Sequence, residues 1–355
     1  MRHTPKTSAL VAAASLGIAG LGMVGMSGCS TSGSDDAKVV TLITHDSFAL
    51  PEAVLAQFTA TTGWQVKVVA AGDAGTMVNQ LVLTQGAPLG DAVFGIDNTF
   101  ATRALEAGVL APADTVTVPA DAAAHGLPGD DDGRLVAVDY ADVCVNVDTT
   151  WFADHGTRPP ATLDDLTDPA YRGLFVTPSP VTSSPGFAFL LATITAKGDQ
   201  WPQYWKDLGA NGVQVAASWS DAYVSSFTAG GGGGDRPVVV SYDTSPPFTV
   251  PEGASEPTTA ALLDTCVRQT EYAGILTGAK NPAGAAALVE FLVSDAVQET
   301  IAEAMYMYPV STTVVLPDAW VAWAPLASDP FVVDPAAIAA NRATWLQTWT
   351  DLDVG

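Results

Sequence analysis

The chain has 355 residues, a length typical of two domains, and its 38 acidic and 14 basic residues give a formal charge of −24. So acidic a chain repels nucleic-acid phosphates and anionic membrane surfaces, and we expect no nucleic-acid partner. Charged residues make up only 15% of the sequence and hydrophobic residues 48%, which argues against a largely disordered chain.

The N-terminus has the pattern of an export signal. A short basic segment precedes an apolar run over residues 9–26, which ends in small residues. Cys29 follows Ser-Gly, as in a bacterial lipobox, so we predict a lipoprotein signal peptide over residues 1–28 and a polar tether over 29–38. Acylated Cys29 would anchor an extracytoplasmic protein to the outer face of the cell membrane, its only membrane contact. The alternative is a simple signal peptide with an incidental cysteine.

Export changes the charge and the redox setting of the chain. Removal of residues 1–28 leaves 12 basic and 38 acidic residues, a formal charge of −26. Cys144 and Cys266 are the two cysteines that follow Cys29, and compartments outside the cytoplasm permit disulfides. Two cysteines allow one pairing, so we predict a Cys144–Cys266 bridge. Two buried free thiols are the alternative.

The first part of the exported chain alternates strands and helices. The pattern predicts strands over residues 39–44, 65–70 and 92–96, and helices over 50–62, 76–85 and 98–108. Such alternation implies parallel strands with right-handed crossovers. Ligands of such sheets gather beyond the carboxyl ends of the strands. The polar residues that follow these strands are His45, Asp46, Asp73 and Asp97.

Two long extended stretches, 135–147 and 265–276, indicate connections between two α/β lobes. We predict lobe 1 over residues 39–139 and 267–355, and lobe 2 over residues 140–266. Each connection contains one of the paired cysteines, so the disulfide would join the two hinge strands. The remaining predicted elements are strands 173–177, 213–216 and 238–242 and helices 163–166, 184–197, 201–208 and 220–229, with one or two helices over 281–305.

The sequence has little that points to catalysis. It contains no His pair with metal spacing, no cysteine cluster and no Gly-x-Ser-x-Gly elbow. The five-glycine run over 230–234 lacks the Lys-Ser/Thr of a phosphate loop and is interpreted as a flexible hairpin. Asp130–Asp132 is interpreted as a solvated turn rather than a calcium site. We therefore predict a protein without enzymatic activity, metal or cofactor.

Three groups of aromatic residues follow predicted elements. Trp219 and Tyr223 follow one strand, Tyr242 lies at the end of another, and Tyr306 follows a helix. Turns at such positions concentrate binding groups. Ring faces attract cations by ~0.5–2 kcal/mol each, so rings close to carboxylates suit a flat cationic ligand. Core packing is the alternative explanation for any one ring.

Several segments of the exported chain together form a recognisable pattern. They are Thr44–Phe48, Gly95–Asn98, Thr182–Gly186, Trp219–Tyr223, Ser241–Pro246 and Met307–Val310. With these segments in order from about residue 39 to the predicted helix at 345–351, the chain resembles the thiamine-binding proteins of ABC importers. The resemblance implies a type II periplasmic-binding-protein fold, in which two α/β lobes close on the ligand.

The resemblance also implies how a ligand is held. In that family the two thiamine rings stack on aromatics that match Trp219, Tyr242 and Tyr306, and a carboxylate and a serine match Asp73 and Ser183. We expect a monomer that binds thiamine or a thiamine phosphate and passes it to an ABC permease. The ligand-binding residues predicted are His45, Asp46, Asp73, Asp97, Ser183, Ser184, Trp219, Tyr223, Tyr242, Ser245 and Tyr306.

The sequence departs from the family at three places. His45 stands where a tyrosine is usual, Tyr306 where a tryptophan is usual, and no tryptophan follows Phe48 closely. These changes leave open the choice among thiamine, its monophosphate and its pyrophosphate, although the scarcity of basic residues favours thiamine itself. Alternatives are a protein of the same fold for Fe(III) or another organic cation, and an exported thiamine-processing enzyme. An Fe(III) site of that fold needs a Tyr-Tyr pair, which the sequence lacks.

Overall fold

The structure is a computed structural model that describes residues 38–354. The predicted signal peptide, Cys29 and all but the last residue of the predicted tether lie outside the described residues. Within the described part, no helix combines the length and the apolar character that a bilayer crossing requires.

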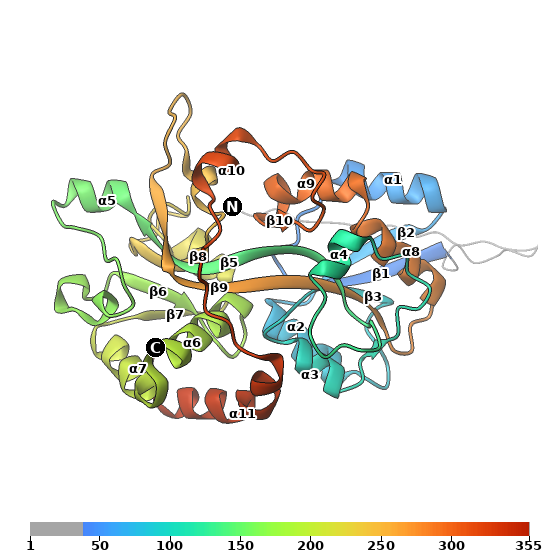
Figure 1. Ribbon diagram of the computed structural model, residues 1–355, viewed down its shortest axis with the longest axis horizontal. Helices are drawn as coiled ribbons and strands as arrows, with labels where there is room; N and C mark the ends of the chain where they lie inside the picture. Colours follow the sequence, from blue (N-terminus) through green and yellow to red (C-terminus); the bar gives the residue numbers. More distant parts are fainter. Residues whose placement is uncertain (1–37, 355) are drawn as a thin grey trace, which may run out of the picture. The chain divides into compact units, whose positions relative to one another are not determined.

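The described residues form one ten-stranded sheet in the order β2-β1-β3-β9-β5-β8-β6-β7, with β4 on β9 and β10 on β5 (Figure 1). The three strands β2-β1-β3 and the three strands β8-β6-β7 are parallel groups at its two ends. This confirms the parallel pairing predicted for the first three strands. The strands are β1 (Val39–Thr44), β2 (Gln65–Ala70), β3 (Ala92–Asp97), β4 (Leu110–Ala111), β5 (Val136–Asp148), β6 (Phe175–Pro178), β7 (Gln214–Ala216), β8 (Val238–Tyr242), β9 (Thr259–Leu276) and β10 (Tyr308–Pro309).

The long strands β5 and β9 lie in the middle of the sheet and join the two parallel groups (Figure 1). They pair antiparallel from Val136–Ala273 to Asp148–Thr259, so β9 starts six residues before the predicted stretch. Cys144 of β5 and Cys266 of β9 are bonded to each other, which confirms the predicted disulfide. The bond ties together the two strands through which both ends of the sheet are connected.

Helices pack against both groups of strands. α6 has the predicted bounds, and the predicted helical region over 281–305 consists of two helices. The helices are α1 (Glu52–Thr62), α2 (Ala74–Leu83), α3 (Ala101–Glu106), α4 (Ala120–Ala124), α5 (Thr149–Asp154), α6 (Ser184–Lys197), α7 (Trp201–Ala210), α8 (Pro282–Leu292), α9 (Asp295–Met305), α10 (Asp318–Trp323) and α11 (Pro335–Asp351).

Three predicted helices differ from the structure. The helix predicted over 98–108 is only α3, because the Asp97 side chain accepts from the Thr99 amide at 2.7 Å and makes a turn before the helix begins. The region predicted as helix 220–229 contains a single π-helical turn, Asp221–Ser226. The segment predicted as helix 163–166 forms a 3₁₀ turn at Asp165–Thr167.

The five-glycine run, interpreted from the sequence as a flexible hairpin, makes close backbone contacts with the preceding turn. It lies against the π-helical turn, with the Gly232 amide donating to the Val224 carbonyl at 3.0 Å. A Cβ atom on Gly230, Gly232 or Gly234 would lie 1.7, 2.3 or 2.1 Å from a backbone oxygen of that turn. The glycines therefore allow a close backbone approach that supports the turn after Trp219.

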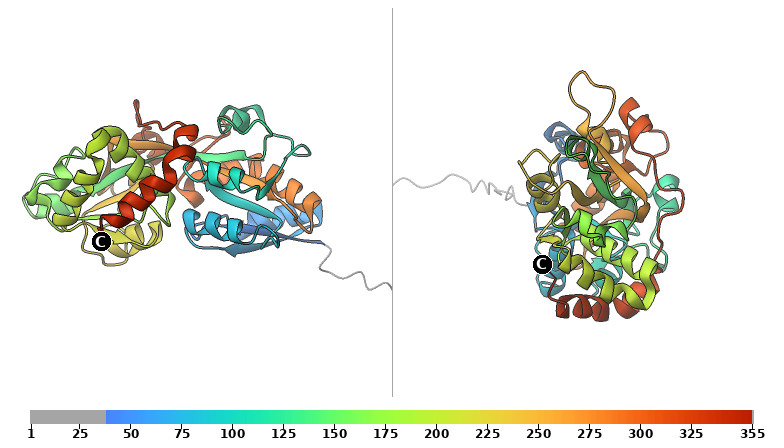
Figure 2. Two further views of the ribbon diagram at one scale, coloured as in Figure 1. Left: turned by 90° about the horizontal axis from the view of Figure 1, so that it is seen from below. Right: turned by 90° about the vertical axis from the view of Figure 1, so that its left-hand side faces the viewer.

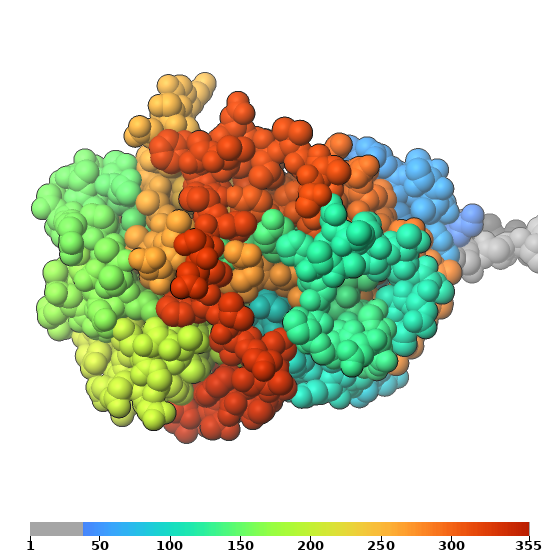
Figure 3. Space-filling model, viewed as in Figure 1, coloured from blue at the N-terminus to red at the C-terminus, as the bar shows by residue number. Residues whose placement is uncertain are grey.

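The C-terminal segment crosses the molecule and contacts both groups of strands and helices. After α10 it passes over β5 and β9, where the Phe331 amide donates to the Cys266 carbonyl at 2.7 Å (Figures 1 and 3). α11 then lies between the α6–α7 side and the α2–α3 side (Figure 2). Its Arg342 guanidinium lies 4.6 Å from the ring centre of Phe100 and 5.4 Å from that of Phe187.

The apolar core extends along both groups of strands. β3 is buried along its whole length, and α6 is buried from Ser184 to Thr193, so neither has the alternation of a half-exposed element. Full burial of each large apolar side chain contributes ~1.5–3 kcal/mol. The packed strands and helices set the positions of the loops that follow β1, β3, β7 and β8.

Candidate functional site

A cavity of about 330 Å³ lies beside β9, beyond the ends of β1 and β8. Five residues of the predicted ligand set line it: His45, Asp46, Trp219, Tyr242 and Tyr306. The other lining residues were not predicted. They are Ser47, Phe48, Ala49, Ser220, Val224, Glu271, Ala304, Met305 and Met307.

His45 lies on the floor of this cavity, directly after β1. Its ring fits because residue 95 is glycine: a Cβ there would lie 2.0 Å from the His45 Cδ2 atom. Gly95 has φ +93° at a register shift in the pairing of β3 with β9, a conformation that favours glycine. Ser47 Oγ lies 2.9 Å from His45 Nδ1, and Glu271 Oε2 lies 3.4 Å from His45 Nε2. Burial lowers the pKa of His45, but the charges of Glu271 and neighbouring aspartates raise it above its usual value.

Glu271 is the buried carboxylate of the cavity floor, and it was absent from the predicted set. It is 5% exposed, and Gln269 Nε2 donates to its Oε1 at 3.1 Å. The same amide donates to the Tyr242 hydroxyl at 3.2 Å, so Gln269 positions both the Tyr242 side chain and the Glu271 carboxylate. The sequence carried no clear signal for Glu271, because β9 also contains Arg268 and Gln269 and the alternation alone does not show which polar side chain faces the cavity.

Two further carboxylates flank Glu271 on the neighbouring strands. Asp97 of β3 and Asp139 of β5 are its register partners, and both are fully buried. Burial raises the pKa of Asp97 to about 6, although hydrogen bonds from Ser184 and Thr99 oppose this. Burial, with the adjacent Glu271 charge, raises the pKa of Asp139 well above its usual value. The floor therefore retains protons at a pH at which exposed carboxylates have lost them.

Trp219 is held by contacts on three sides. Its backbone amide donates to Asp73 Oδ2 at 2.8 Å and its indole Nε1 donates to Ser241 Oγ at 3.0 Å. The Tyr223 ring is stacked on it with centres 5.1 Å apart and an interplanar angle of 12°. One face of the indole is thus covered and its position is fixed before any ligand binds.

Tyr306 lines the cavity opposite Trp219. It has φ 60°, in the left-handed region that a bulky residue rarely adopts, at the end of α9. Thr244 Oγ1 donates to its carbonyl, and the Phe248 ring is stacked on its ring at 3.5 Å. The centres of the Tyr306 and Trp219 rings are 6.2 Å apart at 63°. These contacts compensate the backbone strain and orient the ring toward Trp219.

Six residues of the predicted ligand set do not line the cavity. Asp73 is occupied by the amides of Trp219 and Ala74, Tyr223 supports Trp219, and Ser245 Oγ lies 2.9 Å from Ser241 Oγ. Ser184 donates to Asp97, and Ser183 is the buried N-cap residue of α6. The six residues outside the lining are Asp73, Asp97, Ser183, Ser184, Tyr223 and Ser245.

Contacts also join the start of α2 to the start of α6. The Thr76 amide donates to the Thr182 carbonyl at 3.1 Å, and a Cβ on Gly75 would lie 2.8 Å from that carbonyl. Together with the Asp73–Trp219 and Asp97–Ser184 hydrogen bonds, they connect the β2-β1-β3 side with the β8-β6-β7 side.

The charges around the cavity are acidic. Among residues 38–354, no lysine or arginine lines it, whereas Asp46 and Glu271 do. In the same part of the chain, no group of three or more His, Cys, Asp or Glu side chains is arranged to hold a metal ion. The side chains present suit a cationic ring system better than an anion.

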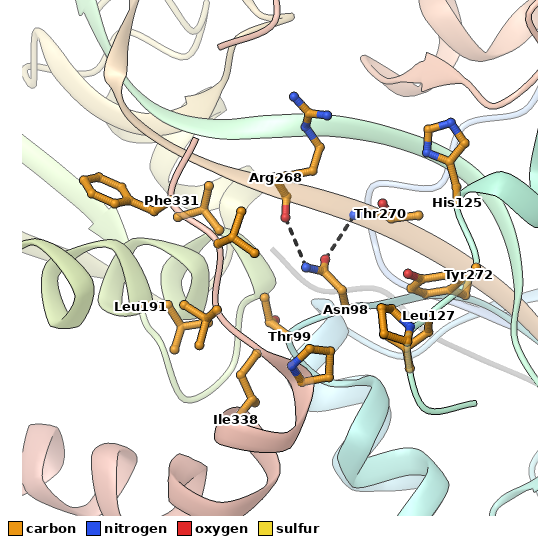
Figure 4. A pocket seen from close by; sticks show the side chains of 16 residues that line it. Asn98, Thr99, His125, Leu127, Leu191, Arg268, Thr270, Tyr272, Phe331 and Ile338 are labelled. Carbon is orange, nitrogen blue, oxygen red and sulfur yellow. Dashed lines mark hydrogen bonds between the residues drawn. The ribbon is translucent and has the colours of Figure 1, made fainter. Parts of the chain in front are cut away.

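A second cavity of about 220 Å³ lies on the opposite face of β9 (Figure 4). Arg268, Thr270 and Tyr272 face it, whereas Glu271 faces the first cavity, as the two-residue period of a strand requires. The Asn98 side chain joins the wall to β9, donating to the Arg268 carbonyl at 3.1 Å and accepting from the Thr270 amide at 3.0 Å. The rest of this wall is largely apolar, with Leu127, Leu191, Phe331 and Ile338 among its residues.

Comparison with known proteins identifies the family. The sequence profile described as bacterial extracellular solute-binding protein matches residues 90–327. The chain belongs to this family. A thiamine-binding periplasmic protein of Escherichia coli (strain K12) is 30% identical to this solute-binding protein over 88% of this chain and 92% of the relative.

Solved structures agree on the fold of this solute-binding protein. A periplasmic thiamin binding protein aligns with a TM-score of 0.76 and 28% identity, covering 88% of this chain and 96% of that chain. Iron-bound HitA from Pseudomonas aeruginosa aligns with a TM-score of 0.66 and 20% identity over 88% of this chain and 99% of that chain, which shows a shared fold alone. The predicted type II periplasmic-binding-protein fold is confirmed, as is the resemblance to the thiamine-binding proteins. Members of the family bind solutes outside the cell.

Proposed function

We propose that this protein binds thiamine in the cavity between Trp219 and Tyr306 and delivers it to the permease of an ABC importer. The observation that carries the proposal is the combination of fixed aromatic rings with an acidic floor. Thiamine has a permanently cationic thiazolium ring and a flat aminopyrimidine, and this cavity offers ring faces and carboxylates to both. The names of the similar proteins support the same ligand.

Binding draws on preorganised contacts. Each aromatic face that covers the thiazolium contributes ~0.5–2 kcal/mol, more when water is excluded. Because Tyr223 and Asp73 already hold Trp219, little conformational entropy is lost when the ligand stacks on it. Glu271 supplies the counter-charge on the floor. We therefore assign Asp73, Asp97, Ser183, Ser184, Tyr223 and Ser245 to positioning the walls of the cavity.

We also propose that the two lobes close around the ligand. We place the hinge in β5 and β9, with lobe 1 formed by residues 39–139 and 267–355 and lobe 2 by residues 140–266. The hydrogen bonds from Trp219 to Asp73 and from Ser184 to Asp97 join the two proposed lobes. Opening would break them, so they favour the closed state.

Thiamine is the proposed ligand in preference to its phosphates. A phosphate needs cationic or amide donors, and the lining has no lysine or arginine among residues 38–354. We further propose that the protein is a monomer without enzymatic activity, anchored outside the cell through acylated Cys29. An exported enzyme acting on thiamine needs a nucleophile, and Cys144 is disulfide-bonded.

A thermal-shift screen of the purified protein tests the proposal. The ligands are thiamine, its monophosphate, its pyrophosphate, the isolated aminopyrimidine and Fe(III). We expect thiamine to give the largest rise in Tm, by mass action on the folded state, and Fe(III) to give none. A rise with Fe(III) and none with thiamine would overturn the proposal. Mass spectrometry of thiamine after incubation should show no turnover product.

A further inference from the structure

Three buried carboxylates lie in a row across the centre of the sheet. Glu271 of β9 is the register partner of Asp97 on β3 and of Asp139 on β5. Their exposed fractions are 5%, 0% and 0%. We call Asp97, Glu271 and Asp139 the carboxylate row; Glu271 is the member that lines the cavity.

Such a row is unfavourable unless something balances it. Like charges directly opposite each other on neighbouring strands destabilise a sheet, and a buried carboxylate needs a partner. Within residues 38–354, the salt bridges to the row comprise one contact, from His45 Nε2 to Glu271 Oε2 at 3.4 Å. Neither carboxylate oxygen of Asp139 has a hydrogen-bond donor in the same part of the chain. The row therefore has three acids and, among the described residues, one basic side chain in salt-bridge contact with it.

We propose that the carboxylate row, with His45, is the counter-charge for a permanently cationic ligand, and that ligand and protons compete for it. The inference rests on the proposed function and deepens it by naming the ligand class: an organic cation without phosphate. When the cation binds above Glu271, the floor releases protons that it holds in the ligand-free protein. When the cation leaves, protons return and restore the charge balance.

The environment of the carboxylate row favours proton release when a cation binds. Burial, together with the adjacent Glu271 charge, raises the pKa of Asp139 and Asp97. The charge of Glu271 also raises the pKa of His45, with smaller contributions from Asp73 and Asp46. A cation close by favours the ionised acids and the neutral imidazole, so binding lowers all three pKa values. The titratable and charged groups that face the row from other elements are His45, Asp46, Asp73, Tyr242, Tyr272 and, on α11, Arg342.

The row also explains why Glu271 is better placed than Asp73 to offset the ligand charge. Asp73 already accepts backbone amides with both of its oxygens, from Ala74 at 2.6 Å and from Trp219 at 2.8 Å. Glu271 accepts one side-chain hydrogen bond, and its other oxygen faces His45 and the cavity. Glu271 is therefore the specificity-determining carboxylate of the site.

Calorimetry with two ligands tests the inference. The ligands are thiamine and a neutral analogue in which a carbon atom replaces the quaternary ring nitrogen. Each is titrated into the purified wild-type protein, Glu271→Gln and Asp139→Asn at pH 6.0 and 7.5, in two buffers of different ionisation enthalpy. Glu290→Gln, which removes an exposed carboxylate on α8, controls for net charge. A thermal melt of each variant confirms that it folds.

We expect wild-type protein to release up to about one proton when it binds thiamine, and none when it binds the neutral analogue. Glu271→Gln should weaken thiamine ~10- to 100-fold and the analogue less than ~3-fold. Asp139→Asn, which does not alter the lining, should weaken thiamine by a smaller factor and reduce proton release. Glu290→Gln should leave both affinities unchanged.

Equal losses for both ligands in Glu271→Gln, or thiamine binding without proton release, would overturn the inference. Either result leaves the proposed function intact, because wild-type protein still binds thiamine. If the wild-type protein binds neither ligand, the proposed function itself fails. The two failures are therefore distinguishable in one set of titrations.

Discussion

The two faces of β9 differ in chemistry although they share one strand. On one face, Gln269 and Glu271 support the floor of the aromatic cavity, where the buried acids outnumber the basic groups. On the other face, Arg268 forms an ion pair with Asp142, and the second cavity is lined mostly by apolar side chains (Figure 4).

The two faces show that one strand can stabilise the fold on one side and contribute to ligand binding on the other. Charges on the rear face are compensated by neighbours within the chain: Asp142 accepts from Arg268 Nη2 at 3.1 Å and from the Ala327 amide at 2.8 Å. The buried carboxylates on the cavity face are not fully compensated by basic side chains within the described residues. A cationic ligand can supply the missing positive charge. Substitutions on the rear face should therefore change stability, and substitutions around the cavity should change affinity.

Loss of the disulfide should have the largest effect on the free energy of unfolding. The bond joins β5 and β9, the two central strands that connect both ends of the sheet. The bond between Cys144 and Cys266 closes a loop with a sequence separation of 122 residues. The double variant Cys144→Ala/Cys266→Ala should lose ~2–5 kcal/mol of unfolding free energy. Urea unfolding under non-reducing conditions measures it, and an unchanged midpoint at equal m-value would contradict the expectation.

Trp219→Ala should weaken thiamine binding by ~1–3 kcal/mol, since it removes a fixed stacking surface and its cation–π contribution. Calorimetric titration gives the affinity. The matched control is Trp151→Ala on α5, where the tryptophan is stacked on His155 and does not line the cavity. The assignment of Trp219 is wrong if both variants bind thiamine equally well.

Arg268→Met should separate the two faces of β9 most clearly. It leaves the fully buried Asp142 carboxylate without its ion pair, at a cost of ~1–3 kcal/mol in unfolding free energy. Affinity for thiamine should change less than about 3-fold, because the side chain faces away from the floor. A large loss of affinity with little loss of stability would reverse the roles of the two faces.

The pH dependence of stability should show the smallest effect. The raised pKa of Asp97, about 6, means that the folded state binds more protons than the unfolded state between pH 4 and 6. Stability of the ligand-free protein should therefore fall by about 1 kcal/mol between pH 5 and pH 7 on account of this group. The raised pKa of His45 acts in the same direction, because its charge–charge contacts weaken as the imidazole loses its proton.

Comparison with Asp97→Asn isolates that group. The variant keeps the shape of the side chain and should flatten the fall in unfolding free energy, measured by urea unfolding at a series of pH values. Parallel curves for the two proteins would show that Asp97 does not titrate differently on folding.

The sequence predicted the fold well where hydrophobic patterns were long and turn residues were clear. Helix α6 has the predicted bounds, and α1 ends at Thr62 as predicted, with Gly63 after it in a left-handed conformation. The predicted site residues His45, Trp219, Tyr242 and Tyr306 meet at one cavity although they are distant in the chain. The rule that binding groups gather in the turns after strands and helices was sufficient for these four.

The sequence could not predict contacts that depend on register between distant strands. Glu271 and Asp139 were hidden within long extended runs, and their alignment with Asp97 follows from pairing across three strands. The close packing of the five-glycine run on Tyr223 and Val224 is also a tertiary contact. Asp73 was predicted from its place after a strand and from the family resemblance, and only the structure shows that both of its oxygens accept from backbone amides.

We propose that the cavity binds thiamine as a cation and disfavours phosphate. Calorimetric titration of the purified wild-type protein at pH 7.5 with thiamine and with thiamine pyrophosphate is the decisive test. We expect saturable binding of one thiamine per chain and weaker binding of the pyrophosphate. No saturable heat with thiamine, or tighter binding of the pyrophosphate, would contradict it.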